Sequence, residues 1–236
     1  MIFDHTFHAA STPSVAAFLV ICALVPGMFL RGIWLGALSQ GRDPFRWTLY
    51  VLGGLALWLG LAAGLVATGW TEAVPVHLLI AGTTMMLGSV ILGLSPAGKW
   101  ISLACPAGWL LAFQGFRLPL ELVLHSWVHQ GVIPRTMTWT GSNWDILSGI
   151  ASLVLAPVCS RSRAAAWLGN IVGIVLLLNV GRVAILSAPV PFGWGDVTPR
   201  LLLPFHLPYA LILPVCVGGA LAGHVILTRA LLLRKC

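Results

Sequence analysis

The segment SVAAFLVICALVPGMFLRGIWLGAL, residues 14–38, decides the fold of this chain. It is 25 residues long and carries a single charged residue, Arg31, near its C-terminal end. Because a helix rises about 1.5 Å per residue, a segment of this length is longer than the roughly 30 Å of hydrocarbon in a bilayer. We therefore expect residues 14–38 to cross a membrane as a helix.

The composition extends this interpretation to the whole chain. Of the 236 residues, 58% are hydrophobic and 8% are charged, and the mean hydropathy is +0.96. Such values lie outside the range of soluble globular domains. We expect an all-α, polytopic membrane helix bundle that forms a single domain over residues 1–236. Hydropathy predicts about seven transmembrane helices, at residues 14–38, 47–69, 75–95, 100–127, 144–160, 165–188 and 203–228.

The basic residues predict the orientation of this bundle, since short cytoplasmic loops are enriched in Lys and Arg. With the N-terminus outside and the C-terminus cytoplasmic, nine basic residues fall on the cytoplasmic side and two fall outside. The nine are Arg31, Arg42, Arg46, Lys99, Arg161, Arg163, Arg229, Arg234 and Lys235, and the two are Arg135 and Arg200. The net charge of +7 is thus spread over short loops and a tail, which excludes nucleic acid as a partner and leaves the lipid bilayer.

A stripe of polar residues interrupts the fourth predicted helix. Arg117, Glu121, His125 and His129 are spaced four residues apart, and residues with this spacing lie on one face of a helix. Charged side chains are expensive within a membrane and usually have a function there. The stripe is therefore the first candidate for a functional site.

Further polar residues are predicted to lie near the outer ends of the other helices. They are His77, Asn143, Asp145, Asn179, Arg182 and His206. Arg117 and Arg182 need acidic partners, so we expect Arg117 to pair with Glu121 or Asp145, and Arg182 to pair with the acid that remains. The inner half of the bundle has little polar character beyond Asn170 and His224, and we interpret His224 as a packing residue.

Three kinds of site fit these residues. In the first, Arg117, Glu121, Asp145 and Arg182 form an ionic network that only fixes helix packing. In the second, Glu121, His125 and His206 bind a transition metal, with His77, His129 or Asp145 as further ligands, or two histidines hold a haem. In the third, the site is catalytic or binds an anionic or lipid-like substrate. Its residues are then Glu121, His125, Arg117, Asp145, Arg182 and His206.

Two resemblances to known families arise at these segments. The runs FRLPLELVLH (116–125), MTWTGSNWDILSGI (137–150) and LLLNVGRVAILSAPVPF (176–192) resemble those of an uncharacterised family of multi-pass bacterial membrane proteins. The likeness covers about the second half of the chain. It implies that Arg117, Glu121, His125, Asn143 and Asp145 belong to one site in a bacterial inner membrane, and it implies no activity.

The second resemblance is to the exosortase and archaeosortase family of intramembrane transpeptidases. The sequence NVGR at 179–182 and the Phe205, His206 step are similar to motifs of that family, whose catalytic set is Cys, Arg and His. Leu147 precedes Ser148 and Gly149 where the family has its cysteine nucleophile. The resemblance therefore implies a similar scaffold without the covalent mechanism.

Together these features predict an inner-membrane protein whose polar site opens to the outer leaflet. We expect a membrane-embedded enzyme, or a protein that binds a ligand or metal. One alternative is a non-catalytic subunit whose apolar faces bind another membrane protein. The other is an exosortase-like scaffold that has lost its nucleophile.

Overall fold

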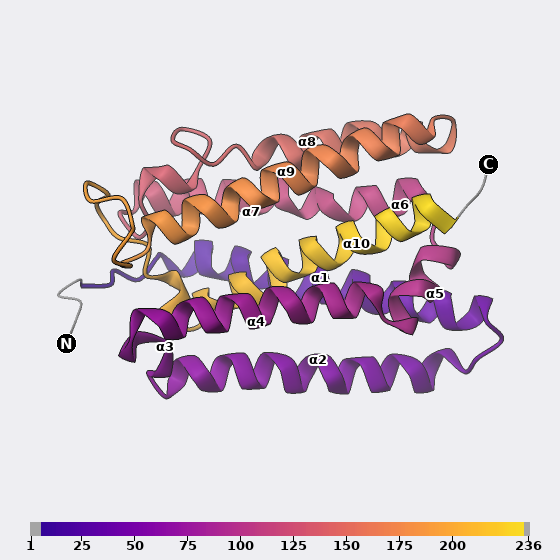
Figure 1. The fold of residues 1–236 in the computed structure, drawn as a ribbon, viewed down its shortest axis with the longest axis horizontal. Helices are drawn as coiled ribbons and strands as arrows, with labels where there is room; N and C mark the ends of the chain where they lie inside the picture. The colour runs from indigo at the N-terminus through magenta and orange to yellow at the C-terminus, as the bar shows by residue number, and fades with distance from the viewer. Residues whose placement is uncertain (1–5, 234–236) are drawn as a thin grey trace.

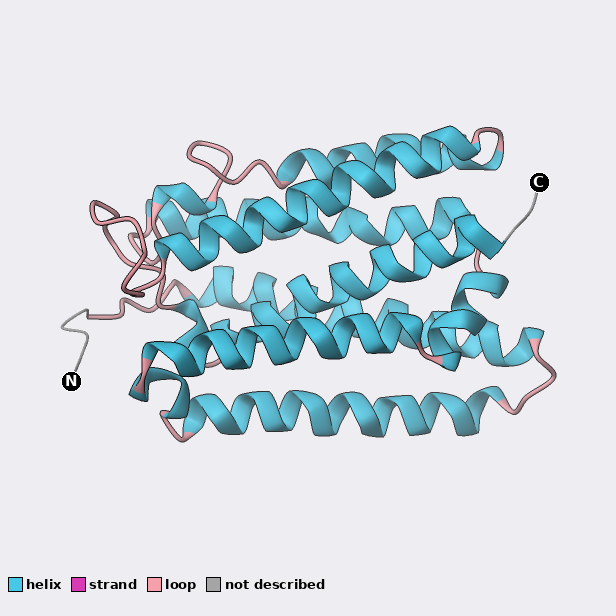
Figure 2. Ribbon diagram, in the orientation of Figure 1, coloured by secondary structure: helices cyan, strands magenta, loops and turns pink. Residues whose placement is uncertain are grey.

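The computed structural model describes residues 6–233 as a bundle of helices, and no strand occurs among these residues. The long helices run side by side along the longest axis of the molecule (Figures 1 and 2). The α-helices are α1 (Thr12–Ser39), α2 (Pro44–Ala67), α3 (Trp70–Ala73), α4 (Pro75–Leu94), α5 (Pro96–Ala104), α6 (Ala107–Ala112), α7 (Arg117–His129), α8 (Ile146–Leu155), α9 (Arg163–Ser187) and α10 (Gly218–Leu233). Short 3-10 segments are η1 (Phe113–Phe116), η2 (Arg135–Met137), η3 (Ala156–Ser160), η4 (Leu203–Phe205) and η5 (Tyr209–Leu211), and η6 (Ile212–Val217) is a π-helix.

Capping side chains mark the start of two of the long helices, α2 and α9. The carboxylate of Asp43 accepts hydrogen bonds from the backbone N–H groups of Phe45 and Arg46, at 3.0 and 3.2 Å, at the start of α2. The hydroxyl of Ser162 accepts one from the N–H of Ala165, at 3.2 Å, at the start of α9. These bonds satisfy backbone donors that have no partner within the helix.

The chain is a multi-pass membrane protein. In the described part of the chain, five helical segments are long and apolar enough to cross a bilayer: Thr12–Ser39, Pro44–Ala67, Val76–Leu94, Arg163–Ser187 and Tyr209–Leu233. Their outward faces carry large apolar side chains, and Leu57, Ile91 and Leu178 are each about two-thirds exposed. Apolar surface on this scale is stable in lipid rather than in water.

The last span occupies the middle of the bundle. Helix α10 packs between α4 and α9 and also contacts α5 and α6. Half of the most apolar stretch of the span Tyr209–Leu233 is buried. Helix α1 crosses behind it and joins two apolar clusters, one around Phe18 and Trp127 and one around Ile33 and Leu227. Helix α2 contains no buried residue and packs mainly on α1.

The fourth predicted helix, residues 100–127, is broken in the structure. Helix α5 ends at Ala104, Cys105 is extended, and Pro106 precedes a new helix that begins at Ala107. Proline has no N–H to donate and disfavours helical geometry in the residue before it, which is why the break falls here. The polar stripe therefore belongs to the segment α6–η1–α7, from Ala107 to His129.

The helical hydrogen-bond pattern of the segment α6–η1–α7 also changes in its middle. Residues Phe113–Phe116 form a 3-10 turn just before Pro119, which cannot donate to the carbonyl of Gly115. The predicted fifth helix is likewise short, an α-helix of 10 residues continued by a 3-10 turn that contains Pro157. The α-helical parts of these two predicted spans are short, so neither is among the five long apolar segments.

Candidate functional site

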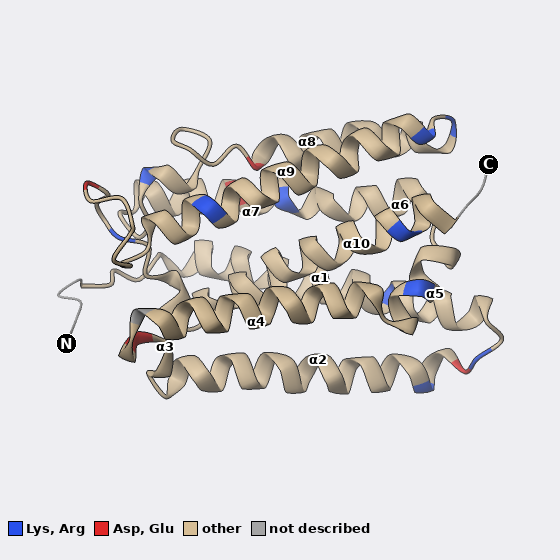
Figure 3. Cartoon of the chain, in the orientation of Figure 1, with Lys and Arg blue, Asp and Glu red and all other residues tan. Residues whose placement is uncertain are grey.

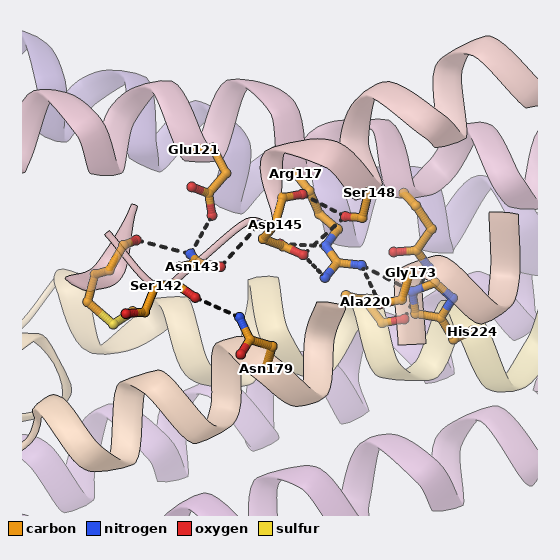
Figure 4. Close-up of polar contacts among 12 residues, drawn as sticks. Arg117, Glu121, Ser142, Asn143, Asp145, Ser148, Gly173, Asn179, Ala220 and His224 are labelled. Carbon is orange, nitrogen blue, oxygen red and sulfur yellow. Dashed lines mark hydrogen bonds and ion pairs between the residues drawn. The ribbon is translucent and has the colours of Figure 1, made fainter. Parts of the chain in front are cut away.

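A buried ion pair between Arg117 and Asp145 forms the centre of the site (Figure 4). Nε of Arg117 donates to Oδ2 of Asp145 at 2.7 Å, and Nη2 of Arg117 donates to Oδ1. The exposed fraction of Arg117 is 1%. Of the two acids expected beside Arg117, the structure therefore selects Asp145.

The start of α8 holds the Asp145 carboxylate in place. The backbone N–H of Asp145 donates to Oδ1 of Asn143 at 3.1 Å, and the hydroxyl of Ser148 lies 3.1 Å from Oδ1 of Asp145. Helix α8 approaches α7 closely at Gly149, where an added Cβ would lie 2.6 Å from the backbone nitrogen of Leu118. The small residue lets the two helices meet, and this contact brings Asp145 to the arginine.

The other side of the guanidinium contacts helices α9 and α10. Nη1 of Arg117 donates to the carbonyl oxygen of Gly173 at 3.0 Å and lies 3.2 Å from Nε2 of His224. Because a guanidinium only donates, Nε2 of His224 accepts, and Nδ1 carries the hydrogen that it shares with Oδ1 of Asn170 at 2.9 Å. Nδ2 of Asn170 donates in turn to the hydroxyl of Thr228 at 2.8 Å.

Arg117 is therefore almost fully used within the protein. Of its five N–H donors, four are engaged by Asp145, Gly173 and His224. A guanidinium in this state has little left to offer an anionic ligand. The bonds of Arg117 thus join it to α9, to α10 and to the residue that precedes α8.

Glu121 differs from Arg117 in having a carboxyl oxygen without a hydrogen-bond partner. Its exposed fraction is 1%, and Oε1 accepts a hydrogen bond from Nδ2 of Asn143 at 2.8 Å. Nδ2 of Asn143 also donates to the carbonyl of Met137 at 3.0 Å, so the amide is itself fixed. Oε2 of Glu121 is buried and finds no hydrogen-bond partner among residues 6–233. An unpaired buried polar atom is costly, and in native proteins it calls for an explanation.

A cavity of about 80 Å³ lies against this carboxyl group. Its polar side chains are those of Arg117, Glu121 and Asp145, and the rest of its wall is apolar. The apolar lining comes mainly from α7, α9, η6 and residues 201–204. It includes Leu124, Leu177, Leu201, Leu213 and Val217. The cavity thus places one polar face inside an otherwise hydrocarbon-like enclosure.

The structure does not bring the predicted metal ligands together. The ring of His125 stacks on Trp139 with centroids 4.2 Å apart, and its Nε2 lies 3.1 Å from Nε2 of His129. The ring of His206 stacks on Phe7 at 4.0 Å. Within residues 6–233, no group of three or more His, Cys, Asp and Glu side chains is arranged to hold a metal ion. Of Glu121, His125 and His206, only Glu121 lines the cavity.

Arg182 also lies apart from the ion pair. Its Nη2 donates to Oδ1 of Asn179 at 3.0 Å, its side chain is exposed, and its guanidinium lies 6.0 Å from the ring centroid of Trp194. The predicted pairing of Arg182 with Glu121 or Asp145 is wrong, since neither acid forms an ion pair with it. An exposed arginine on α9 does not need a buried counter-charge.

The polar residues of the inner half, Asn170 and His224, were not expected beside Arg117 from the sequence. Asn170 and His224 are both buried and connect Arg117 to α9 and α10. Gly173, near the middle of the 25-residue α9, is the carbonyl partner of Arg117. The ion pair therefore lies near mid-length of the bundle. The signal that could have found these residues is their polarity within apolar spans.

No family model, curated protein or solved structure matches this chain. The site is thus defined by its own geometry: a buried Arg117–Asp145 pair with four of the five Arg117 N–H donors engaged, and beside it Glu121, which has one buried oxygen without a partner and lines a small cavity.

Proposed function

We propose that the chain crosses the inner membrane of a bacterium seven times, with its N-terminus outside and its C-terminus in the cytoplasm. Residues 107–129 and 146–160 then form the fourth and fifth spans, alongside the five longer ones. The start of α1 and the end of α10 lie at opposite ends of the bundle, which an odd number of spans requires (Figure 1). Most of the lysine and arginine positions, blue in Figure 3, gather at the end where α10 finishes, as the excess of cytoplasmic basic residues predicts.

This topology predicts the behaviour of reporter fusions. Alkaline phosphatase fused after Cys236 is expected to be inactive, and a green fluorescent protein at the same place is expected to fluoresce. Phosphatase inserted after Asp196, in the loop before η4, is expected to be active. An active phosphatase at the C-terminus would overturn the proposed orientation.

We propose further that the protein binds a hydrogen-bond-donating group of a ligand at Glu121. Two observations carry this proposal: Oε2 of Glu121 is buried without a hydrogen-bond partner among the described residues, and Glu121 is one of the residues that line the cavity. Because four of the five N–H donors of Arg117 are engaged, the polar face of the cavity offers a ligand mainly the carboxyl group of Glu121. A ligand that complements it presents an N–H or O–H group, such as an amine or a hydroxyl.

The size of the cavity narrows the ligand further. At about 80 Å³ it admits a few heavy atoms, since one water takes about 30 Å³ of liquid. The part of the ligand that enters is therefore a small head group. If the protein is an enzyme, Glu121 is the group positioned to take a proton from that head group, and Arg117 and Asp145 position the surrounding helices.

Methylammonium is a suitable probe because it is small and carries three N–H donors. We expect it to raise the melting temperature of the wild-type protein in lipid nanodiscs, by roughly 2–4 °C for each kcal/mol of binding energy. Glu121→Gln should lose most of this shift, because its amide nitrogen replaces the acceptor. Tetramethylammonium, which has the same charge but no N–H, should give no shift.

The matched control is Glu72→Gln, which changes the only other glutamate of the chain, an exposed residue on α3. It should respond to methylammonium as the wild type does. Equal shifts in the wild type and in Glu121→Gln would place the binding elsewhere and refute the proposal.

The second candidate function is that of a structural subunit whose polar network only fixes helix packing. The four engaged donors of Arg117 favour it, since every bond that they make is to another part of this chain. The two candidates differ at Glu121. A purely structural network predicts no methylammonium shift in any variant, whereas the ligand site predicts a shift that depends on Glu121.

A further inference from the structure

A second and larger cavity, of about 410 Å³, lies between α1, α2, α4 and α10. This volume falls within the range of about 300–1,000 Å³ that is typical of ligand pockets. Its walls include Phe29, Leu55, Trp58, Leu92 and Val215. It is separate from the Glu121 cavity because η6 and the start of α10 stand between the two.

The serine hydroxyls that line this cavity already form hydrogen bonds within the protein. The hydroxyl of Ser89 donates to the carbonyl of Met85 at 2.8 Å, and that of Ser95 donates to the carbonyl of Leu92 at 2.7 Å. Both bonds stay within the helix turn that carries the serine. The wall thus offers a ligand mostly apolar contact, which suits a hydrocarbon chain.

The packing of α2 explains why the space exists. Helix α2 packs on α1 and has hardly any contact with α4, while Trp58 reaches across to Gly88, where an added Cβ would lie 2.7 Å from the indole ring. Gly54 lines the cavity one turn before Trp58, and a Cβ added there would meet nothing within 4 Å. The open length along α2, from Val51 to Leu59, is roughly 12 Å at 1.5 Å per residue.

One end of the cavity reaches the basic end of the bundle. Ser95 lines it, and Nη1 of Arg229 donates to the carbonyl of Ser95 at 2.9 Å. Lys99 follows one turn later on α5, and Arg46 lies in the first turn of α2; both side chains are exposed. Asp43, the acidic residue nearest to Arg46 in sequence, caps α2. Arg46 and Lys99 do not line the cavity, but they lie at the end of the bundle that it reaches, and basic side chains at such a position favour anionic head groups.

We propose that this cavity holds one hydrocarbon chain of an anionic bilayer lipid, with the phosphate of that lipid against Arg46 and Lys99. The apolar wall accounts for the chain, and the basic end accounts for the charge. This site goes beyond the ligand site at Glu121, and neither depends on the other.

The first test fills the cavity from α2. Native mass spectrometry of the protein, released from nanodiscs of equal parts phosphatidylglycerol and phosphatidylcholine, should show one retained phosphatidylglycerol. Gly54→Leu should lower the retained lipid about tenfold or more, because its side chain displaces methylene groups from an apolar wall. Gly53→Leu is the matched control: the neighbouring glycine lies outside the lining, and its Cβ also meets nothing within 4 Å. Equal retention in the two variants would overturn the proposal.

The second test removes the charge and leaves the wall intact. In the double variant Arg46→Gln and Lys99→Gln, retained lipid should remain, but the preference for phosphatidylglycerol over phosphatidylcholine should disappear. Arg135→Gln, at the opposite end of the bundle, should keep the preference. A preference unchanged by the double variant would refute the assigned position of the phosphate.

A third measurement needs no variant, so it stands even if a substituted protein folds poorly. Phosphatidylglycerol with a photoreactive diazirine in its acyl chain is incorporated with the wild-type protein and irradiated. Adducts should concentrate on cavity residues of α2, α4 and α10, such as Leu55, Leu92 and Ala222. Adducts spread evenly over the lipid-facing surface, or adducts on a co-purified protein instead, would contradict the proposal.

Discussion

Replacing Asp145 with asparagine is expected to lower the free energy of unfolding by roughly 3 kcal/mol or more. This is the usual cost of breaking a buried ion pair by the removal of one partner. Asparagine keeps the shape of the side chain but leaves the guanidinium of Arg117, with an exposed fraction of 1%, without its counter-charge. The measurement is reversible unfolding of the purified protein in mixed detergent micelles, followed by tryptophan fluorescence.

Two further variants make this result specific. Asp196→Asn changes an exposed acid in the loop before η4 and should alter stability by roughly 0.5 kcal/mol or less. The double variant Arg117→Met and Asp145→Leu should be less destabilised than Asp145→Asn, because it leaves no buried charge behind. If Asp145→Asn unfolds like the wild type, the two side chains do not form the buried pair described above.

Alanine at Gly173 is expected to cost roughly 1–3 kcal/mol, the range for forcing extra volume into a packed core. Its Cβ would lie 2.3 Å from Cε1 of His224, a buried ring that Asn170 and Arg117 hold in place. The ring would have to move, and its bond with Arg117 would be lost. Unfolding in the same micelles measures the effect.

A second glycine on the same helix provides the control. Gly181→Ala should be neutral or stabilising by about 0.5–1 kcal/mol, since an added Cβ there meets nothing within 4 Å and alanine favours helix. Adding His224→Ala to Gly173→Ala should cost less than the sum of the two single changes, because the clash disappears with the ring. Strict additivity of the two would contradict the contact.

The fold was largely predictable because span length and hydropathy leave few alternatives. Five predicted spans, starting at residues 14, 47, 75, 144 and 165, begin within three residues of helices in the structure. The fourth failed at its start, since hydropathy averages over the Cys105–Pro106 break that backbone geometry imposes. A hydropathy window does not register a proline between two apolar stretches.

The acidic residues of the candidate site could be predicted from the sequence. The residues that form hydrogen bonds with Arg117 from other helices were less predictable. The spacing of Arg117 and Glu121 on one helical face, and the need of a membrane arginine for an acid, both led to residues that line one cavity in the structure. Which helices supply the other partners depends on packing, so the roles of His224 and Asn170 could not be read from spacing. His125 and His206 stack on aromatic rings instead of lining the cavity, and such pairings leave no periodic signal.

A structure of the protein in lipid, at a resolution that shows ordered solvent, tests the central claim most directly. That claim is that the free oxygen of Glu121 binds a hydrogen-bond-donating group in the cavity beside the Arg117–Asp145 pair. It predicts density that does not belong to the protein within about 3 Å of Oε2. A donor of the protein bonded to Oε2, with side chains filling the cavity, would contradict it.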